Sequence, residues 1–362
     1  MNFLFTSGHP AQVHNFRLVY QELKSHGHSV FWLTTNKDIA VDLLNIYKIS
    51  FGLFYKPKKN LLSQLFALCK NTCYAISFIK RNKIDIAVSR TDPYISLACF
   101  VLRRTHIILD DTEHASKSIR QKPFIKMASC VLTAESFYLN VSPHQIRFAG
   151  NIELFYCHPN RFKVQEPWVL LQIPTDTRYA IVRFVKWDAY HDKGLIGGFT
   201  LEQKRKLVNQ LSQYLRVFIS SEGALPDDLI RYRINIPLDR MHDVEACASL
   251  LIGESATMAS EATILGTPAI YLDEVGRGYT DEEAREQLLY MFSPRNNGAE
   301  TAITKAMEVV SPSFDILSWK QRHHKWLQKK IDATAFFTWF LENYPESFKI
   351  MKENPDYQYR FK

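Results

Sequence analysis

The chain has 362 residues, of which 46% are hydrophobic and 13% aromatic, and its formal net charge is +8. This content supports packed cores and excludes a disordered chain, and the length favours two domains over one. Residues 1–150 carry 19 basic and 9 acidic side chains, a balance of +10, whereas residues 151–362 have a balance of −2. The first half is expected to meet an anionic partner, with a merely solvated basic surface as the alternative.

The six cysteines are scattered and mostly lie in apolar runs, which indicates buried thiols in a reducing compartment. Cys69 and Cys73 lie four residues apart in a helical stretch, but no second ligand pair accompanies them, so we expect no zinc site there. Residues 1–10 lack the pattern of a secretory signal. No apolar run approaches the roughly 20 residues of a membrane-spanning helix. These features predict a cytoplasmic protein.

The opening residues predict a βαβ unit, the usual beginning of a doubly wound parallel sheet. Gly8 permits a tight turn after the first strand, and His9 and His14 flank that turn. The turn lies at the carboxyl edge of the sheet, where ligands bind in open α/β sheets. We therefore expect an acceptor-side loop at Gly8 and His9 and a candidate base at His14. Hydrogen-bonded structural histidines are the alternative.

A long helical stretch over residues 61–80 combines apolar positions with a ring of cations. The cations are Lys56, Lys58, Lys59, Lys70, Lys80, Arg81 and Lys83. Such a helix can lie on an anionic membrane surface. An ordinary crossover helix with a solvated rim is the interpretation that we favour, because most such helices pack on a sheet.

Acidic residues cluster at the end of the strand predicted over residues 105–109. The sequence there is Asp110-Asp111-Thr112-Glu113-His114. Crowded carboxyl groups raise each other's pKa, and a neighbouring imidazole can share the proton. Asp111, Glu113 and His114 are therefore candidates, together with His14, for a general base that deprotonates a sugar hydroxyl. Helix capping by Asp111 or Thr112 is the alternative.

The second half begins after residues 151–165, a polar, proline-containing stretch where we place the domain boundary. A strand over residues 179–186 delivers Arg183 and Lys186 to the sheet edge. Cations there would neutralise the charge of a departing diphosphate. A structural salt bridge between Arg183 and Glu254 or Asp188 is the alternative, since unpaired buried cations are costly.

Residues 249–273 contain a strand, a small-residue loop, a helix, a glycine stop and a second strand, which predicts another βαβ unit. Gly253 marks the turn, and Ser255 or Thr257 would cap the helix. The backbone N–H groups of such a loop can approach an anion, and the helix dipole favours negative charge there. Glu261 lies about one turn further along and suits the two hydroxyls of a ribose. A well-packed crossover with a surface glutamate is the alternative.

This unit resembles a known group of proteins. The stretches that carry the resemblance are Gly253-Glu254-Ser255-Ala256-Thr257-Met258-Ala259, Glu261 and Gly266-Thr267-Pro268-Ala269-Ile270. They are similar to an uncharacterised prokaryotic family, a domain of unknown function placed among the B-fold glycosyltransferases. More broadly, they resemble the donor-nucleotide loop of those transferases and of UDP-N-acetylglucosamine 2-epimerases. The resemblance covers nearly the whole chain, from Gly8 to about Phe340.

The resemblance implies that Glu261 contacts the ribose and that Ser255, Ala256 and Thr257 hold the phosphates. The short stretch with Pro237 and His242 resembles the segment that contacts the nucleotide base. The expected nucleotide-sugar-binding residues are Arg183, Lys186, Pro237, His242, Gly253, Glu254, Ser255, Ala256, Thr257 and Glu261.

Asp111-Thr112-Glu113-His114 also matches the uncharacterised family. In the 2-epimerases, a similar position holds a His-x-Glu-Ala-Gly segment near the active site. Here Asp-Thr-Glu-His-Ala stands in a comparable place without the Gly-Leu-Arg continuation. This departure disfavours epimerase chemistry.

We therefore expect an α/β chain with two Rossmann-like, doubly wound domains facing a cleft, the B-type glycosyltransferase fold. The expected parts are an acceptor domain over residues 1–155, a nucleotide-sugar domain over 156–330, and a C-terminal helix over 331–362 that crosses back to the first domain.

The expected reaction is glycosyl transfer from a nucleotide-diphosphate sugar, expected to be UDP-linked, to a hydroxyl of a glycan or lipid-linked acceptor, in surface polysaccharide or glycolipid synthesis. No metal and no cofactor are expected, because a helix N-terminus and cations can stabilise the leaving group. The alternatives are a UDP-sugar 2-epimerase or hydrolase and a nucleotide-sugar-binding module without turnover. Peripheral contact with the inner face of an anionic membrane would suit the basic first half, whereas no aromatic and basic nucleic-acid motif accompanies the charge.

Overall fold

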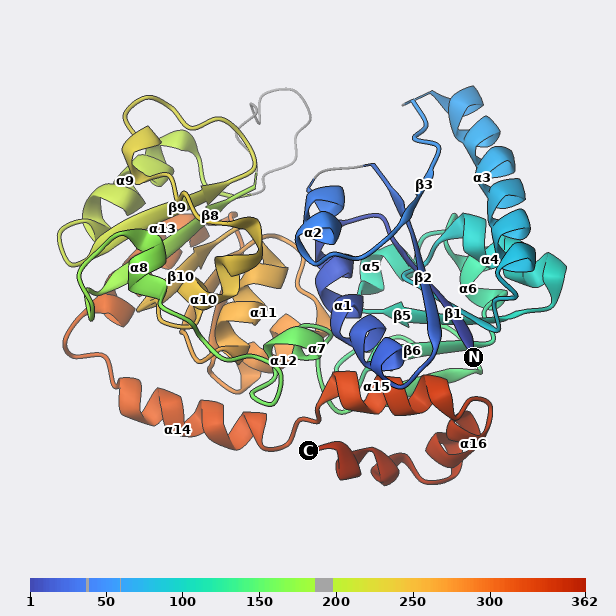
Figure 1. Cartoon of the computed structure of the whole chain (residues 1–362). Helices are drawn as coiled ribbons and strands as arrows, with labels where there is room; N and C mark the ends of the chain where they lie inside the picture. The colour runs from blue at the N-terminus through green and yellow to red at the C-terminus, as the bar shows by residue number, and fades with distance from the viewer. Residues whose placement is uncertain (37–38, 59, 186–197) are drawn as a thin grey trace. The chain divides into compact units, whose positions relative to one another are not determined.

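The computed structural model describes residues 1–36, 39–58, 60–185 and 198–362, and it forms two compact units (Figure 1). Unit 1 comprises Met1–Tyr156 and Lys330–Lys362, and unit 2 comprises Cys157–Lys329. The boundaries expected from sequence, 155/156 and 330/331, each lie one residue from these. Each unit contains one parallel sheet with helices packed on it, which confirms the predicted α/β class.

The sheet of unit 1 has the strand order β3-β2-β1-β4-β5-β6-β7. Its strands are β1 (Asn2–Ser7), β2 (Ser29–Thr35), β3 (Gly52–Phe54), β4 (Ile86–Ser89), β5 (Thr105–Asp110), β6 (Cys130–Ala134) and β7 (Gln145–Phe148). The chain builds outward from β1 in one direction and then from β4 in the other. The strand order therefore reverses between β1 and β4, which defines the ligand-binding switch point of a doubly wound sheet.

The helices of unit 1 cover both faces of this sheet. They are α1 (Pro10–Ser25), α2 (Ala40–Ile46), α3 (Leu61–Arg81), α4 (Pro93–Leu102), α5 (Glu113–Ser116), α6 (Lys122–Lys126), α7 (Leu154–Cys157), which ends at the unit boundary, α15 (Ala333–Glu342), α16 (Glu346–Glu353) and the 3-10 helix η3 (Pro355–Phe361). The core is rich in aromatic rings. Phe5 packs against Phe16 of α1 at 5.4 Å between ring centroids and against Trp32 of β2 at 5.8 Å.

The C-terminal segment differs from the single helix that the sequence predicts. Residues 331–362 form α15, α16 and η3, and Asp332 begins α15 by accepting a hydrogen bond from the Ala335 N–H at 3.0 Å. The Ile331 N–H donates to the Ala149 carbonyl at 3.0 Å, and Thr338 Oγ1 donates to Glu22 of α1 at 2.8 Å. The segment is therefore part of unit 1, where α15 packs against α1 (Figure 1).

The sheet of unit 2 has the order β12-β11-β10-β8-β9. Its strands are β8 (Tyr179–Phe184), β9 (Arg216–Ser221), β10 (Leu250–Gly253), β11 (Ala269–Leu272) and β12 (Leu289–Phe292). Its helices are α8 (Pro167–Leu171), α9 (Leu201–Leu211), η1 (Ile230–Tyr232), η2 (Leu238–Arg240), α10 (Met241–Glu245), α11 (Ala256–Ile264), α12 (Gly278–Arg285), α13 (Gly298–Val310) and α14 (Ile316–Leu327). Two apolar clusters sandwich the sheet, and its switch point lies between β8 and β10.

Candidate functional site

The N-terminus of α11 lies at the switch point of unit 2. Ser255 is its N-cap, with extended backbone, and Ser255 Oγ accepts a hydrogen bond from the Met258 N–H at 3.4 Å. Ser255 rather than Thr257 therefore caps the helix. Ala256 and Thr257 form the first turn, whose backbone N–H groups have no partner within a helix. These donors and the positive end of the helix dipole favour an anion at this position.

Arg183 lies at the carboxyl end of β8, directly beside that helix start in the sheet. It is the register partner of Gly253, the last residue of β10. Its guanidinium donates to Ser220 Oγ at 3.0 Å and to Glu222 at 2.5 Å, whereas its Nε has no hydrogen-bond partner within the described part of the chain. A salt bridge between Arg183 and Glu254 was an alternative expected from the sequence. In the structure, Arg183 forms its ion pair with Glu222.

Glu254 is engaged by the backbone of its own unit. Its carboxylate accepts hydrogen bonds from the N–H groups of Val185 and Phe199, both at 2.8 Å, and lies 3.5 Å from Lys204 Nζ. Glu254 therefore joins the loop after β10 to the two chain segments that flank residues 186–197. Lys186, the second expected cation of this region, lies outside the described residues.

Glu261 lies on α11 and is buried, with only 5% of its surface exposed. This excludes the surface glutamate that sequence offered as an alternative. Its Oε1 lies 3.1 Å from Nε2 of His242, which is buried on α10. The structure thus brings together the residues expected to hold the ribose and the base, whereas Pro237 lies exposed before η2.

Glu245 is a buried residue of this cluster that the sequence analysis missed. Its side chain is fully buried on α10, and neither carboxylate oxygen has a hydrogen-bond partner among the residues that the structure describes. Burial first, and then the negative charge of Glu261, raise the pKa of Glu245 well above its usual range, while Arg183 opposes the shift. The spacing of His242 and Glu245, three residues apart on one helical face, is the signal that could have found it.

The acidic cluster of unit 1 is held by a cation from the neighbouring strand. Arg90, which follows β4, forms an ion pair with Asp111 after β5, and its guanidinium lies 3.9 Å from Asp110. Thr112 Oγ1 donates to Asp111 at 2.7 Å. The positive charge of Arg90 therefore offsets part of the negative charge of these carboxylates. Arg90 was not predicted as a site residue, although its place just after the apolar run over residues 86–88 is a detectable signal.

The other two members of that cluster lie in the short helix α5. Glu113 begins the helix and is buried. His114 follows it, and its side chain lies outside the described part of the structure.

His9, in the turn after β1, has a structural role, which was the alternative to a binding role. His9 caps α1 by accepting from the Ala11 N–H at 3.3 Å, and the Gly8 N–H donates to Gln12 Oε1 at 2.7 Å. His14 is buried on α1, and its Nδ1 lies 3.3 Å from the Tyr47 hydroxyl.

Asp92 is a further carboxyl group beside the switch point of unit 1. It begins α4 by accepting from the N–H groups of Tyr94 and Ile95 at 2.9 and 3.3 Å. Burial raises the pKa of Asp92 to about 6, although those bonds and the Thr6 hydroxyl of β1 lower it. Asp92 therefore titrates closer to neutrality than an ordinary aspartate.

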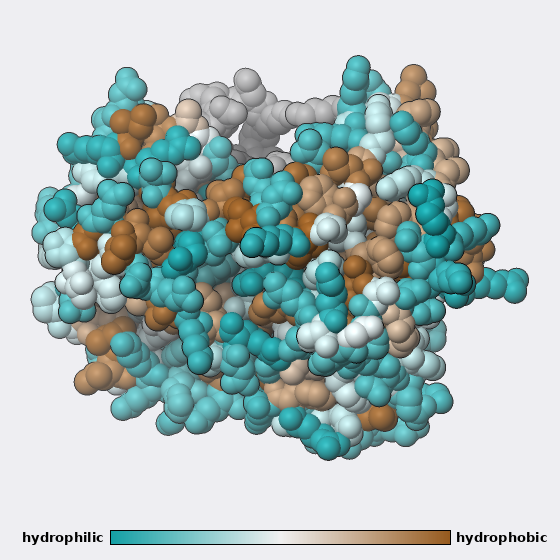
Figure 2. Space-filling model, viewed as in Figure 1, coloured by the Kyte–Doolittle hydropathy of each residue, from teal (hydrophilic) through white to brown (hydrophobic). Residues whose placement is uncertain are grey.

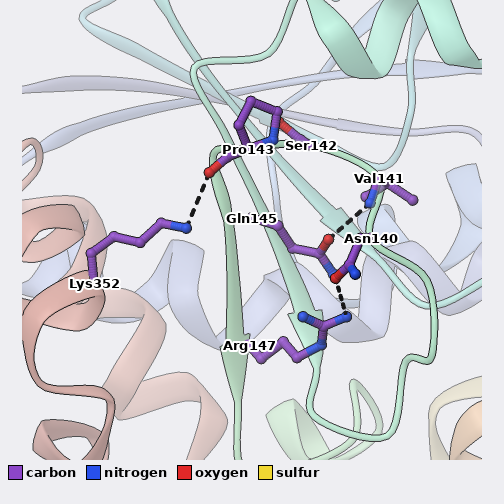
Figure 3. A pocket seen from close by; sticks show the side chains of 7 residues that line it. All are labelled: Asn140, Val141, Ser142, Pro143, Gln145, Arg147 and Lys352. Carbon is purple, nitrogen blue, oxygen red and sulfur yellow. Dashed lines mark hydrogen bonds between the residues drawn. The ribbon is translucent and has the colours of Figure 1, made fainter.

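A pocket of about 440 Å³ lies elsewhere in unit 1, beside β7 (Figure 3). Lys352 Nζ donates to the Pro143 carbonyl at 3.1 Å, and Arg147 donates to Asn140 Oδ1 at 3.1 Å. None of the site residues expected from sequence lines this pocket. Since its cations are bonded to the loop around them, we assign them a structural role.

No protein-family model matches the chain, and no curated protein sequence matches it either. Solved structures do match. The UDP-GlcNAc 2-epimerase of Neisseria meningitidis bound to UDP-GlcNAc superposes with a TM-score of 0.66 at 11% identity, over 95% of this chain and 100% of that chain. MurG of Acinetobacter baumannii gives 0.58 at 14% identity, over 94% and 99%. A glycosyltransferase of Rickettsia africae gives 0.55 at 14%, over 98% and 99%. The chain therefore has the α/β fold that 2-epimerases and B-type glycosyltransferases share.

Proposed function

We propose that the protein is a glycosyltransferase that moves a sugar from a UDP-linked donor to a hydroxyl acceptor, and that unit 2 binds the donor. The observation that carries this proposal is the position of Arg183 and of the strand end that leads into α11, which are neighbours at the switch point of the sheet. Arg183 ends β8, Gly253 ends the adjacent β10, and the helix capped by Ser255 follows. A guanidinium and a helix N-terminus at one sheet edge form a site for a diphosphate.

In the proposed reaction, the departing diphosphate remains at the start of α11. Negative charge grows on it as the glycosidic bond to the donor sugar breaks. The backbone N–H groups of Ala256 and Thr257 and the Arg183 guanidinium are fixed before the reaction and stabilise that charge. The transfer step therefore needs no metal. Glu261 would accept hydrogen bonds from the ribose with the carboxylate positions not used by His242.

Unit 1 would supply the acceptor site and the general base. Asp111, Glu113, His14 and His114 remain the candidates for that base. The guanidinium of Arg90 forms an ion pair with the Asp111 carboxylate. A carboxylate can accept the proton of an acceptor hydroxyl as a general base.

The test is a product assay with UDP-sugars. The protein is incubated with each donor, with and without an extract of glycans and lipid-linked sugars, and products are identified by mass spectrometry. Transfer predicts UDP release that depends on the extract and an acceptor heavier by one sugar. An epimer or UDP formed without the extract would favour the epimerase or hydrolase, which the fold shared with the Neisseria meningitidis epimerase keeps as the second candidate. UDP-sugar binding without any product would favour the binding module.

We further propose that α3 contacts an anionic membrane, as a lipid-linked acceptor would require. Its inner face is buried in unit 1, but its first turns expose large apolar side chains (Figure 2). These are Leu61 (71% exposed), Leu62 (80%), Leu65 (51%) and Phe66 (57%). Lys70 Nζ lies beside them, 5.7 Å from the Phe66 ring centroid, and Lys56 lies on the preceding segment. Apolar side chains flanked by cations fit the boundary of an anionic bilayer. Among the described residues, no helix is long and apolar enough to cross a membrane.

Co-sedimentation with vesicles tests this contact. We expect binding to vesicles with phosphatidylglycerol and much weaker binding to phosphatidylcholine alone. Leu62→Glu with Phe66→Glu should abolish binding, whereas Val169→Glu, at an equally exposed apolar position in unit 2, should not. Equal binding by both variants would contradict a role of α3.

A further inference from the structure

Three side chains that can bind a metal meet inside unit 2. They are His242 and Glu245 of α10 and Glu261 of α11, and all three are buried. One ligand atom from each lies within 4.8 Å of the others. Two carboxylates and an imidazole therefore share one small region with little contact to water.

Glu245 shows that this cluster needs a ligand. Its side chain has no exposed surface, and neither of its oxygens has a hydrogen-bond partner in the described ranges of the chain. The other buried acids nearby are different. Asp243 accepts from Arg240 Nε at 2.7 Å, and Glu283 accepts from Ser260 Oγ at 2.6 Å. A buried carboxylate without such a partner is strongly unfavourable, and a bound cation would remove that penalty.

The geometry points to a divalent transition-metal ion as that ligand. We propose that His242 Nε2 and one oxygen each of Glu245 and Glu261 bind it. In a tetrahedral site with metal–ligand distances of about 2.1 Å, the ligand atoms lie roughly 3.4 Å apart. His242 Nε2 and Glu261 Oε1 are 3.1 Å apart, which is close to that spacing, and Glu245 would approach by a rotamer adjustment of the order of 1 Å.

The donor set indicates which ions fit. One imidazole nitrogen and two carboxylate oxygens suit Zn²⁺, Mn²⁺ and Fe²⁺, and Zn²⁺ is favoured over the other two by the usual affinity order. A doubly charged ion also balances the two carboxylates. This site departs from the expectation that the chain binds no metal. That expectation rested on the spacing of the cysteines and on the view that a helix N-terminus and cations can stabilise the departing diphosphate.

Metal and nucleotide would compete for one side chain. Glu261 is a ligand here and the ribose contact in the proposed function, so each ligand should weaken the binding of the other. This coupling rests on the proposed function, whereas the metal site itself does not. Metal binding is therefore measured without nucleotide, and nucleotide binding in the presence of a chelator.

The test uses the full chain stripped with EDTA and dialysed against Zn²⁺, with bound zinc measured by mass spectrometry. We expect one tightly held Zn²⁺ per chain in the wild type. Glu245→Gln, which keeps the shape of the side chain, should weaken that binding at least about tenfold. Two control variants should retain the ion: Glu283→Gln, which alters another buried glutamate of unit 2, and Cys69→Ser with Cys73→Ser, which removes the exposed thiols.

A second measurement needs no variant. Co²⁺ added to the stripped wild type should give the intense visible absorption of a four-coordinate site, and Zn²⁺ should remove it. No uptake of either ion, or zinc binding that Glu245→Gln leaves unchanged, would overturn the proposal. If the protein took up zinc in the first measurement but failed to bind UDP in the presence of EDTA, only the proposed function would be contradicted.

Discussion

Arg183 and Gly253 are register partners at the carboxyl ends of the adjacent parallel strands β8 and β10. The strands approach so closely that a Cβ atom on Gly253 would lie 2.2 Å from the Arg183 carbonyl oxygen. The glycine is therefore required by packing against the backbone of its neighbour. It also fixes where α11 begins relative to the guanidinium.

Gly253→Ala should destabilise the protein by about 1–3 kcal/mol, because the new methyl group forces the two strand ends apart. UDP binding should weaken as well, since the start of α11 moves with β10. Urea unfolding measures the first effect and calorimetric titration the second. Gly8→Ala is the matched control, because its Cβ would meet only Gln12 Oε1, at 4.0 Å. Equal stability of the two variants would show that the close approach is not as described.

Arg183→Ala should weaken UDP binding by about 10–100-fold, the loss expected for one or two charge-assisted hydrogen bonds to phosphate. Arg205→Ala removes an exposed arginine that pairs with Asp228 in the same unit, and it should bind UDP as the wild type does. Calorimetric titration at two salt concentrations distinguishes a direct contact from a change in overall charge. Similar losses in both variants would count against a specific phosphate contact.

Asp111→Asn combined with Glu113→Gln should leave UDP binding unchanged and stop transfer to the acceptor. The two substitutions keep the side-chain shapes but remove the carboxylates that can accept a proton. Donor binding, circular dichroism and the product assay are measured on the same preparation. Transfer at the wild-type rate would exclude both residues as the base and leave His14 and His114.

Asp92 should make the protein less stable as the pH rises through about 6. Its folded-state pKa is about 6 against an ordinary value of 3.8, because burial disfavours its charge. Its contribution is therefore full below pH 4 and is lost as the carboxyl group ionises in the folded state. The whole shift corresponds to about 3 kcal/mol, and we expect about 1–2 kcal/mol because the side chain keeps some access to water.

The measurement compares urea unfolding of the wild type and Asp92→Asn at pH 5 and pH 8. Asparagine still caps a helix but does not titrate. Relative to the wild type, the variant should gain about 0.5–1 kcal/mol between the two pH values, because about half of the loss occurs below pH 5. A constant difference between the two proteins would show that Asp92 has an ordinary pKa.

The class of fold could be predicted because its signals are local. Short apolar runs such as residues 250–252 end in glycine or polar turns, and a helical pattern follows. Local pattern also predicted a helix cap at Ser255 or Thr257. The single C-terminal helix over residues 331–362 was predicted wrongly, because the chain breaks it after Glu342 and again after Glu353. The start of this segment is held by the Ile331 N–H, which bonds to the Ala149 carbonyl, a contact across 182 residues that no local pattern contains.

The site residues were harder to predict for the same reason. Glu254 was expected among the nucleotide-sugar-binding residues, but its partner Phe199 lies 55 residues away along the chain. The pairing of Arg90 with Asp111 depends on β4 and β5 being neighbours, which the sequence does not state. The spacing of Glu245 from His242 marks it as a candidate, but its burial beside Glu261 depends on how α10 packs on α11. Which carboxylates meet is decided by strand order and helix packing.

The central claim is that the start of α11 and Arg183 hold a diphosphate, and a crystal structure of the protein with UDP tests it most directly. We expect phosphate oxygens about 3 Å from the backbone nitrogens of Ala256 and Thr257 and from the Arg183 guanidinium, with the ribose hydroxyls at Glu261. UDP bound at any other place in the chain, with the start of α11 facing only solvent, would contradict the account.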